Sequence, residues 1–156
     1  MSRRVPLFFI GWLGFLLAAP LWAQEYSPQG NPLTRLTVKN VPVIAEVVST
    51  PEKHYLGLSH RQSLAEGRGM LFVMGRTELQ AFCMRDMLFS IDILWIADGR
   101  VAGIDPRLSP QDQGTFVSPV PVPLVLEVPA GFARRYGIKV GDPVTIKSSE
   151  SGSKAP

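Results

Sequence analysis

Three charged residues interrupt the apolar stretch from Phe82 to Ile96, namely Arg85, Asp86 and Asp92. Arginine and aspartate are almost never fully buried without a partner. These side chains must therefore lie at the edge of the core, pair with one another, or line a pocket. The rest of the stretch is apolar, which is typical of chain buried on more than one side.

Further charged residues on other predicted elements could join this group. Asp86, Asp92 and Glu127, with Glu46 as a fourth, could act as a general acid and base or supply oxygen ligands to a hard cation. Two arginines, Arg61 and Arg85, could hold a carboxylate or sugar-acid group with paired hydrogen bonds. We expect the ligand-binding set to be Arg61, Arg85, Asp86, Asp92 and Glu127.

A structural role is the alternative for every member of this set. The carboxylates could cap turns, pair with arginines or face water, and Arg61 and Arg85 could form internal salt bridges to Asp92 or Glu127. Spacing does not decide between the two, because the residues belong to different predicted elements.

Other kinds of chemistry find little support. Cys83 is the only cysteine, which excludes an intramolecular disulfide and a metal site built on cysteine pairs. Its apolar neighbours favour a packed, inert thiol. The two histidines, His54 and His60, lack the four-residue spacing of helical metal ligands, and no nucleophile elbow or phosphate loop is present. We predict no catalytic residue, no metal and no cofactor.

The first 23 residues have the layout of a secretory signal peptide. Arg3 and Arg4 precede an apolar run, and small residues at Ala19 and Ala23 offer two cleavage positions, of which Ala23 is preferred. A retained membrane anchor is the alternative, although the run is short for one. Cleavage predicts a periplasmic or secreted protein that has no contact with the membrane afterwards.

Removing this segment lowers the formal charge from +3 to +1, because Arg3 and Arg4 leave and no acidic residue does. The basic pI of 9.3 therefore overstates the case for nucleic acid, and no Lys/Arg-rich run argues for it. We expect no nucleic-acid partner. Residues 24–33 read as a flexible leader, residues 34–147 as a single domain and residues 148–156 as a disordered tail.

Short strands and turn signals dominate the predicted domain. Apolar runs predict strands near residues 36–39, 43–48, 70–74, 81–84, 91–97, 122–128 and 144–147. Asp98-Gly99 predicts a two-residue hairpin turn. Helices are expected after Thr50, as N-cap, and before Gly137, as terminator. Residues 105–121 read as a long loop. The fold class is α+β, mostly β: an antiparallel barrel or sandwich of seven or eight short strands with two short helices.

The order of several motifs resembles the DUF-192 family of small bacterial and archaeal proteins without an assigned function. The matching blocks begin with Gly57-Leu58 and Arg61, and continue with Gly69-Met70-Leu71-Phe72-Val73, Phe82-Cys83-Met84-Arg85, Ile91-Asp92, Asp98-Gly99-Arg100-Val101, Leu126-Glu127-Val128-Pro129-Ala130-Gly131-Phe132, and 137–142. This resemblance covers residues 54–146. It implies a compact β-rich domain, often behind an export signal, and brings no reaction.

The central block departs from the family pattern, which usually reads Phe-Trp-Met-Lys-Asn-Thr. Cys83 stands for the tryptophan, Arg85 for the lysine and Asp86 for the asparagine. If that block lines a ligand site, the ligand of this member differs from that of its relatives.

The sequence therefore favours a non-enzymatic exported module that binds a small polar or carbohydrate-like ligand. We expect the pocket to be bounded by Arg85, Asp86, Asp92 and the loop 105–121. One alternative is a hydrolase acting on envelope glycan with two paired carboxylates. Another is a structural partner of an envelope complex that docks through an exposed apolar patch. The oligomeric state stays open.

Overall fold

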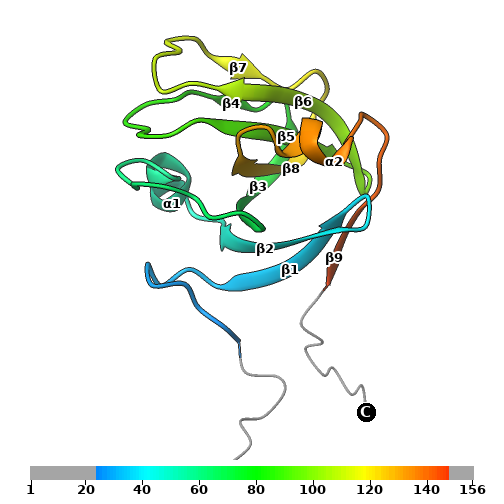
Figure 1. The fold of residues 1–156 in the computed structure, drawn as a ribbon, viewed down its shortest axis with the longest axis horizontal. Coiled ribbons are helices and arrows are strands. Elements are labelled where there is room, and N and C mark those ends of the chain that lie inside the picture. Colours follow the sequence, from blue (N-terminus) through cyan, green and yellow to red (C-terminus); the bar gives the residue numbers. More distant parts are fainter. Residues whose placement is uncertain (1–23, 148–156) are drawn as a thin grey trace, which may run out of the picture.

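A curled seven-stranded sheet forms the body of the protein in the computed structural model, which describes residues 24–147 (Figure 1). Its strand order is β6-β5-β8-β3-β2-β1-β9, and β4 pairs with β7 in a separate small sheet. The elements are β1 (Leu33–Val38), β2 (Val41–Val48), α1 (Pro51–Leu56), β3 (Arg68–Glu78), β4 (Ala81–Phe82), β5 (Ile91–Ala97), β6 (Arg100–Leu108), β7 (Phe116–Val117), β8 (Val122–Pro129), α2 (Phe132–Tyr136) and β9 (Val144–Lys147). The prediction of a mostly β fold with two short helices is confirmed. The predicted signal segment, 1–23, and the predicted tail, 148–156, lie outside the described residues.

One pair of strands in the large sheet is parallel. Strands β2 and β3 run side by side in the same direction, and the connection between them carries α1. All other pairs are antiparallel. At one end of the sheet the two edge strands meet: the N–H of Val101 bonds the carbonyl of Asp142 at 2.9 Å, and the N–H of Val144 bonds the carbonyl of Gly99 at 2.7 Å. These bonds draw β6 towards β9 and give the sheet its partly closed shape.

The curled sheet buries apolar side chains on both of its faces. One cluster gathers residues from β1, β2, β3, β5, β6, β8 and β9 with Phe132, Ala133 and Ile138. The other includes Phe72 and Trp95, and lies under the small sheet and the connection from β4 to β5. The first six residues of β5 are all buried, because their side chains point alternately to the two buried faces of the sheet. The predicted burial of this stretch on more than one side is thereby explained.

The strongest turn and cap signals of the sequence are confirmed. Asp98 and Gly99 have φ of 50° and 66°, as the two-residue hairpin between β5 and β6 requires. Thr50 is extended and its hydroxyl accepts from the N–H of Lys53 at 3.4 Å at the start of α1. Gly137 ends α2 in the left-handed conformation, with φ of 60°.

Two expectations were wrong. The segment 105–121 is not one long loop, since β6 continues to Leu108 and Phe116–Val117 forms β7. Pro106 is accommodated there because β6 is an edge strand, where a missing N–H breaks no essential ladder bond. Cys83 is exposed rather than packed. Phe82 takes the inward position, edge-on to Phe72 and Trp95, so the following side chain turns outward.

Candidate ligand site

Glu127 lies in the middle of the large sheet, on β8. It is opposite Met70 on β3 and opposite Ile93 on β5, so its side chain shares the sheet face of the cluster that contains Phe72 and Trp95. Only 6% of the residue is exposed, and its Oε2 atom has no hydrogen-bond partner among the described residues. An orphaned carboxyl oxygen at such a position requires an explanation, because buried polar groups are almost always paired.

Burial changes the ionisation of this carboxyl. It raises the pKa of Glu127 from 4.5 to about 8, against the opposing positive charge of Arg61. At neutral pH the group is therefore mostly protonated. In that form it offers one O–H donor as well as acceptor positions, and carries no charge.

Glu127 is one of the residues that line a pocket of about 360 Å³. Its walls come from α1 and the turn after it, from β3, and from β4 with the segment that follows. Its lining includes the aromatic rings of His54, Tyr55, Phe72 and Phe82, with Cys83 and Arg85. The pocket thus combines apolar, largely aromatic walls with a few polar groups, as small-molecule sites commonly do.

Arg85 lies at the exposed side of this pocket. Its guanidinium stacks over the ring of Tyr55, 3.7 Å from the centroid, and donates to the Tyr55 carbonyl at 2.6 Å. Both interactions hold the end of α1 against the segment after β4. The salt bridges to Asp92 or Glu127 that the sequence offered as alternatives for Arg85 do not occur.

Asp86 belongs to the turn next to the pocket but does not line it. It has a φ of 54°, and its carbonyl accepts from the N–H of His60 at 2.9 Å. Its carboxylate lies 3.7 Å from Arg85 Nε and 3.9 Å from His60 Nε2, with half of the side chain exposed. Such exposed pairs contribute little to stability. Asp86 therefore shapes the turn that presents Arg85.

Arg61 pairs with Glu46, and not with Asp92 or Glu127, the two partners predicted for it. The two form a paired contact, with Nη1–Oε1 at 2.5 Å and Nη2–Oε2 at 2.9 Å. Ser27 and Asn31, from the predicted leader, donate to the same carboxylate at 2.9 and 2.8 Å. Burial alone would raise the pKa of Glu46, but the hydrogen bonds from Arg61, Asn31 and Ser27 together hold it below its ordinary value.

Asp92 is not a pocket residue, which corrects the predicted arrangement. It is fully buried, and its carboxylate accepts the backbone N–H groups of Arg107, Gly131 and Ala133 at 2.8, 2.8 and 2.9 Å. Successive side chains of a strand point to opposite faces of the sheet, and Ile93 shares the face of Glu127, so Asp92 faces away from the Glu127 pocket. It ties the end of β6 to the turn before α2, which is a structural role.

The structure thus divides the five predicted site residues. Glu127 and Arg85 come together in one pocket, Asp86 supports its rim, and Arg61 and Asp92 are committed to other partners. Sequence reasoning missed His54, Tyr55 and Cys83 as wall residues. His54 lies on α1 and Leu58 in the turn that follows it, and both line this pocket.

Among residues 24–147, no three histidine, cysteine, aspartate or glutamate side chains lie close enough together to hold a metal ion. In the same range, none of the helices has the length and apolar character needed to cross a membrane.

Comparisons with known proteins identify relatives but no activity. The model of the DUF192 family, described as Uncharacterized ACR, matches residues 34–146. A solved protein of unknown function from Novosphingobium aromaticivorans is 30% identical, with a TM-score of 0.74 over 78% of this chain and 91% of that one. A second, from Sinorhizobium meliloti and called a "putative transcription regulator", is 28% identical, with a TM-score of 0.71 over 74% of this chain and 95% of that one. No curated protein matches this chain.

Proposed function

The chain belongs to the DUF192 family, and we propose that this member is an exported, non-enzymatic module that binds a small polar, carbohydrate-like ligand in the Glu127 pocket. One observation carries the proposal. Glu127, whose Oε2 atom is buried without a partner, is one of the residues that line a pocket large enough for a small molecule. A ligand hydroxyl there would supply the missing hydrogen bond.

The chemistry of the pocket favours an uncharged, hydroxyl-bearing ligand. A protonated Glu127 both donates and accepts, which matches an alcohol better than a cation. The exposed ring of Tyr55 and the half-buried ring of Phe82 offer apolar surface to the C–H face of a sugar, although Arg85 already covers one face of Tyr55. Arg85 donates one N–H to the Tyr55 carbonyl and keeps its other N–H groups for a ring oxygen or a hydroxyl of the ligand.

The hydrolase alternative would need a second carboxyl group in the same pocket. Glu127 is the sole acidic residue among those that line it. Glu46 projects from the same sheet face, but four hydrogen bonds from Arg61, Asn31 and Ser27 occupy its carboxylate. A paired acid and base therefore gains no support, whereas binding requires only the one orphaned group.

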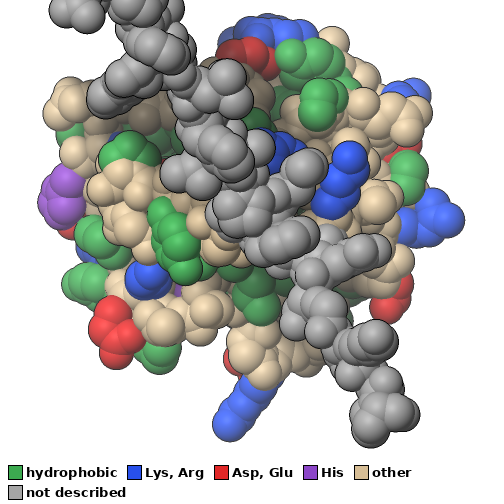
Figure 2. Space-filling model, turned by 90° about the horizontal axis from the view of Figure 1, so that it is seen from below, with side chains coloured by type: hydrophobic (Ala, Val, Ile, Leu, Met, Phe, Trp, Pro, Cys, Tyr) green, Lys and Arg blue, Asp and Glu red, His purple; other side chains and the backbone are tan. Residues whose placement is uncertain are grey.

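The name of the Sinorhizobium relative describes that protein alone. Here the basic side chains on the face in Figure 2 are spread over the surface, interleaved with apolar and neutral ones. Neither this pattern nor the +1 charge of the predicted exported chain supports nucleic-acid binding. Apolar side chains such as Tyr55, Leu56 and Leu88 are more than half exposed, so docking on an envelope protein stays the second candidate.

Export rests on residues 1–23 and is tested by cell fractionation. We expect the protein in the periplasmic or secreted fraction, shortened at Ala23 or Ala19, and mass spectrometry of its N-terminus would identify the cut. Recovery of the uncut chain in the membrane fraction would favour the retained anchor instead.

Ligand binding is tested by the melting temperature of the purified protein across neutral sugars, sugar acids and envelope glycan fragments. A ligand at about one hundred times its dissociation constant adds roughly 2.7 kcal/mol, a shift of several degrees. We expect one class to produce that shift in the wild type and in Glu127→Gln, which keeps a neutral donor and acceptor. Glu127→Leu should lose the shift, and the exposed control Glu78→Gln should keep it.

A panel in which no compound shifts the wild type would argue against the small-ligand function. A shift that persists in Glu127→Leu would place the ligand elsewhere. If the protein releases new reducing ends from a glycan fragment, it is a hydrolase and not a binding module.

A further inference from the structure

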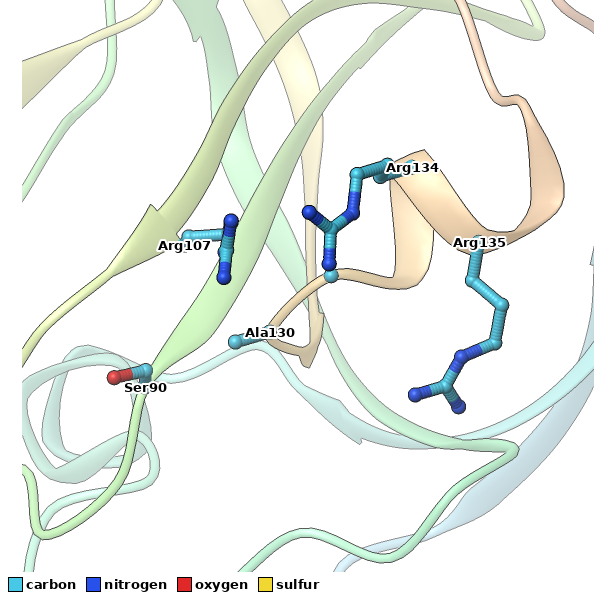
Figure 3. Close-up of a pocket in the computed structure, with 6 residues that line it drawn as sticks. Ser90, Arg107, Ala130, Arg134 and Arg135 are labelled. Carbon is cyan, nitrogen blue, oxygen red and sulfur yellow. The ribbon is translucent and has the colours of Figure 1, made fainter.

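A second pocket, of about 580 Å³, lies on the other side of β5 from the cluster that contains Phe72 and Trp95. Its lining is basic rather than aromatic. Three of the six residues that line it are arginines: Arg107, Arg134 and Arg135. Ser90, Ala130 and Gly131 complete the lining, which contains no acidic side chain. Figure 3 shows the guanidinium groups of Arg107 and Arg134 on the same side of Ala130 in that view, with Arg135 further away along α2.

The backbone behind these arginines is fixed by Asp92. Its buried carboxylate binds the N–H of Arg107 at the end of β6 and the N–H groups of Gly131 and Ala133 at the start of α2. The three bonds clamp together two segments that lie far apart in the sequence. As a result, Arg107 and Arg134 project from a rigid base into the same pocket, although both are exposed side chains.

The charge of this pocket is only partly neutralised. Arg135 forms an ion pair with Glu66, with Nη1–Oε2 at 2.6 Å. Within residues 24–147, Arg107 and Arg134 make no ion pair with any carboxylate. The carboxylate of Asp92 is directed at backbone N–H groups and not at the guanidinium ends. Two unpaired guanidinium groups that converge repel each other, and an anion between them would remove that repulsion.

We propose that this pocket binds the oxyanion group of a small molecule, a phosphate or a carboxylate, through Arg107 and Arg134. Guanidinium groups suit this task because each presents two parallel N–H donors to a pair of anion oxygens. Ser90 also lines the pocket, but Figure 3 shows its hydroxyl pointing away from the two guanidinium groups, so the proposal rests on the arginines alone. The site is independent of the Glu127 pocket and would take a ligand of opposite character, charged rather than neutral.

Isothermal titration calorimetry of the purified protein with inorganic phosphate, pyrophosphate and citrate tests this site. We expect saturable binding of at least one probe with one site per chain, weakened by added salt as anion binding requires. Arg107→Gln and Arg134→Gln should each weaken it by about tenfold or more, because each removes a charged hydrogen-bond donor group. Both residues are exposed, so far-ultraviolet circular dichroism should show unchanged folding.

Two control variants distinguish a specific anion-binding site from non-specific electrostatic attraction to the protein surface. Arg68→Gln removes an exposed arginine outside the pocket and should leave the affinity unchanged, as should Glu127→Leu in the other pocket. Which of the three probes binds most tightly distinguishes a phosphate from a carboxylate ligand. The proposal is overturned if none of them binds saturably, or if Arg68→Gln weakens binding as much as Arg107→Gln does.

Discussion

Glu46 and Glu127 project from the same face of the sheet on either side of Met70, yet the carboxylate of Glu46 is fully hydrogen-bonded and the carboxyl of Glu127 has an oxygen without a partner. Register places Glu46 beside Met70 on one side and Glu127 beside it on the other, which separates their backbones by about 10 Å at normal strand spacing. Arg61 binds Glu46 and leaves Glu127 unpartnered. The pKa of the first carboxyl falls and that of the second rises.

This contrast predicts an unusual dependence of stability on pH. The pKa of Glu127 is raised by folding, so its contribution to stability is complete below pH 4.5 and is lost as the pH rises to about 8. The free energy of unfolding should fall over that window by an amount on the order of 4 kcal/mol. Urea unfolding from pH 4.5 to pH 9 measures it.

Glu127→Gln supplies the matched control, since glutamine has nearly the same shape and does not titrate. Its free energy of unfolding should vary much less over the same window. Glu46 acts at lower pH and in the other direction: its lowered pKa stabilises the protein above pH 4.5, and that contribution is lost on acidification. If the free energy of unfolding of Glu127→Gln varies with pH as much as that of the wild type, a group other than Glu127 is responsible for the variation.

Replacing Glu127 by leucine should stabilise the free protein. The substitution removes an orphaned buried polar group and leaves an apolar side chain of similar size in an apolar cluster. We expect a gain of about 1–3 kcal/mol in the free energy of unfolding at pH 7, with loss of the ligand response. Urea denaturation and the ligand panel measure the two effects. A destabilised Glu127→Leu would indicate that Glu127 serves the scaffold.

Arg61→Met should be strongly destabilising, because it leaves the carboxylate of Glu46 largely buried without its charge partner. The expected loss is about 3 kcal/mol by urea denaturation. In the Glu46→Gln background the same substitution should cost much less, since no charge is then left uncompensated. Equal losses in both backgrounds would show that packing of the Arg61 stem, rather than the ion pair, is what matters.

Asp92→Asn should cost about 2–4 kcal/mol, since the amide oxygen can replace Oδ1, which accepts from Arg107 and Gly131, only if the N–H₂ group is turned towards the N–H of Ala133. The matched control is Asp86→Asn. Asp86 is half exposed with a φ of 54°, which asparagine tolerates, so its change should stay within about 0.5 kcal/mol. Similar losses in the two variants would contradict the distinct roles assigned to them.

Local features of this fold could be predicted from the sequence because local physics determines them. The hairpin at Asp98-Gly99, the cap at Thr50 and the stop at Gly137 each depend on a few adjacent residues. The burial of β5 on two faces followed from its apolar run. Family membership also followed from the order of its motifs, and is confirmed.

The site depended on information that is not local. The N–H partners of Asp92 lie 15, 39 and 41 residues away, so nothing near Asp92 in the sequence marks it as a clamp. The relation of Glu46 to Glu127 requires the parallel β2–β3 pair, which short strands do not reveal. The exposure of Cys83 depends on which neighbour turns inward at β4, and Phe82 does so.

The carboxyl carbon resonance of Glu127, followed by ¹³C nuclear magnetic resonance and assigned with Glu127→Gln, tests most directly whether this buried carboxyl is protonated and binds the ligand. We expect a titration midpoint near pH 8 in the free protein, and a saturable change in that resonance when the ligand class from the melting panel is added. A midpoint near the ordinary value of 4.5, together with a resonance that no ligand moves, would contradict it.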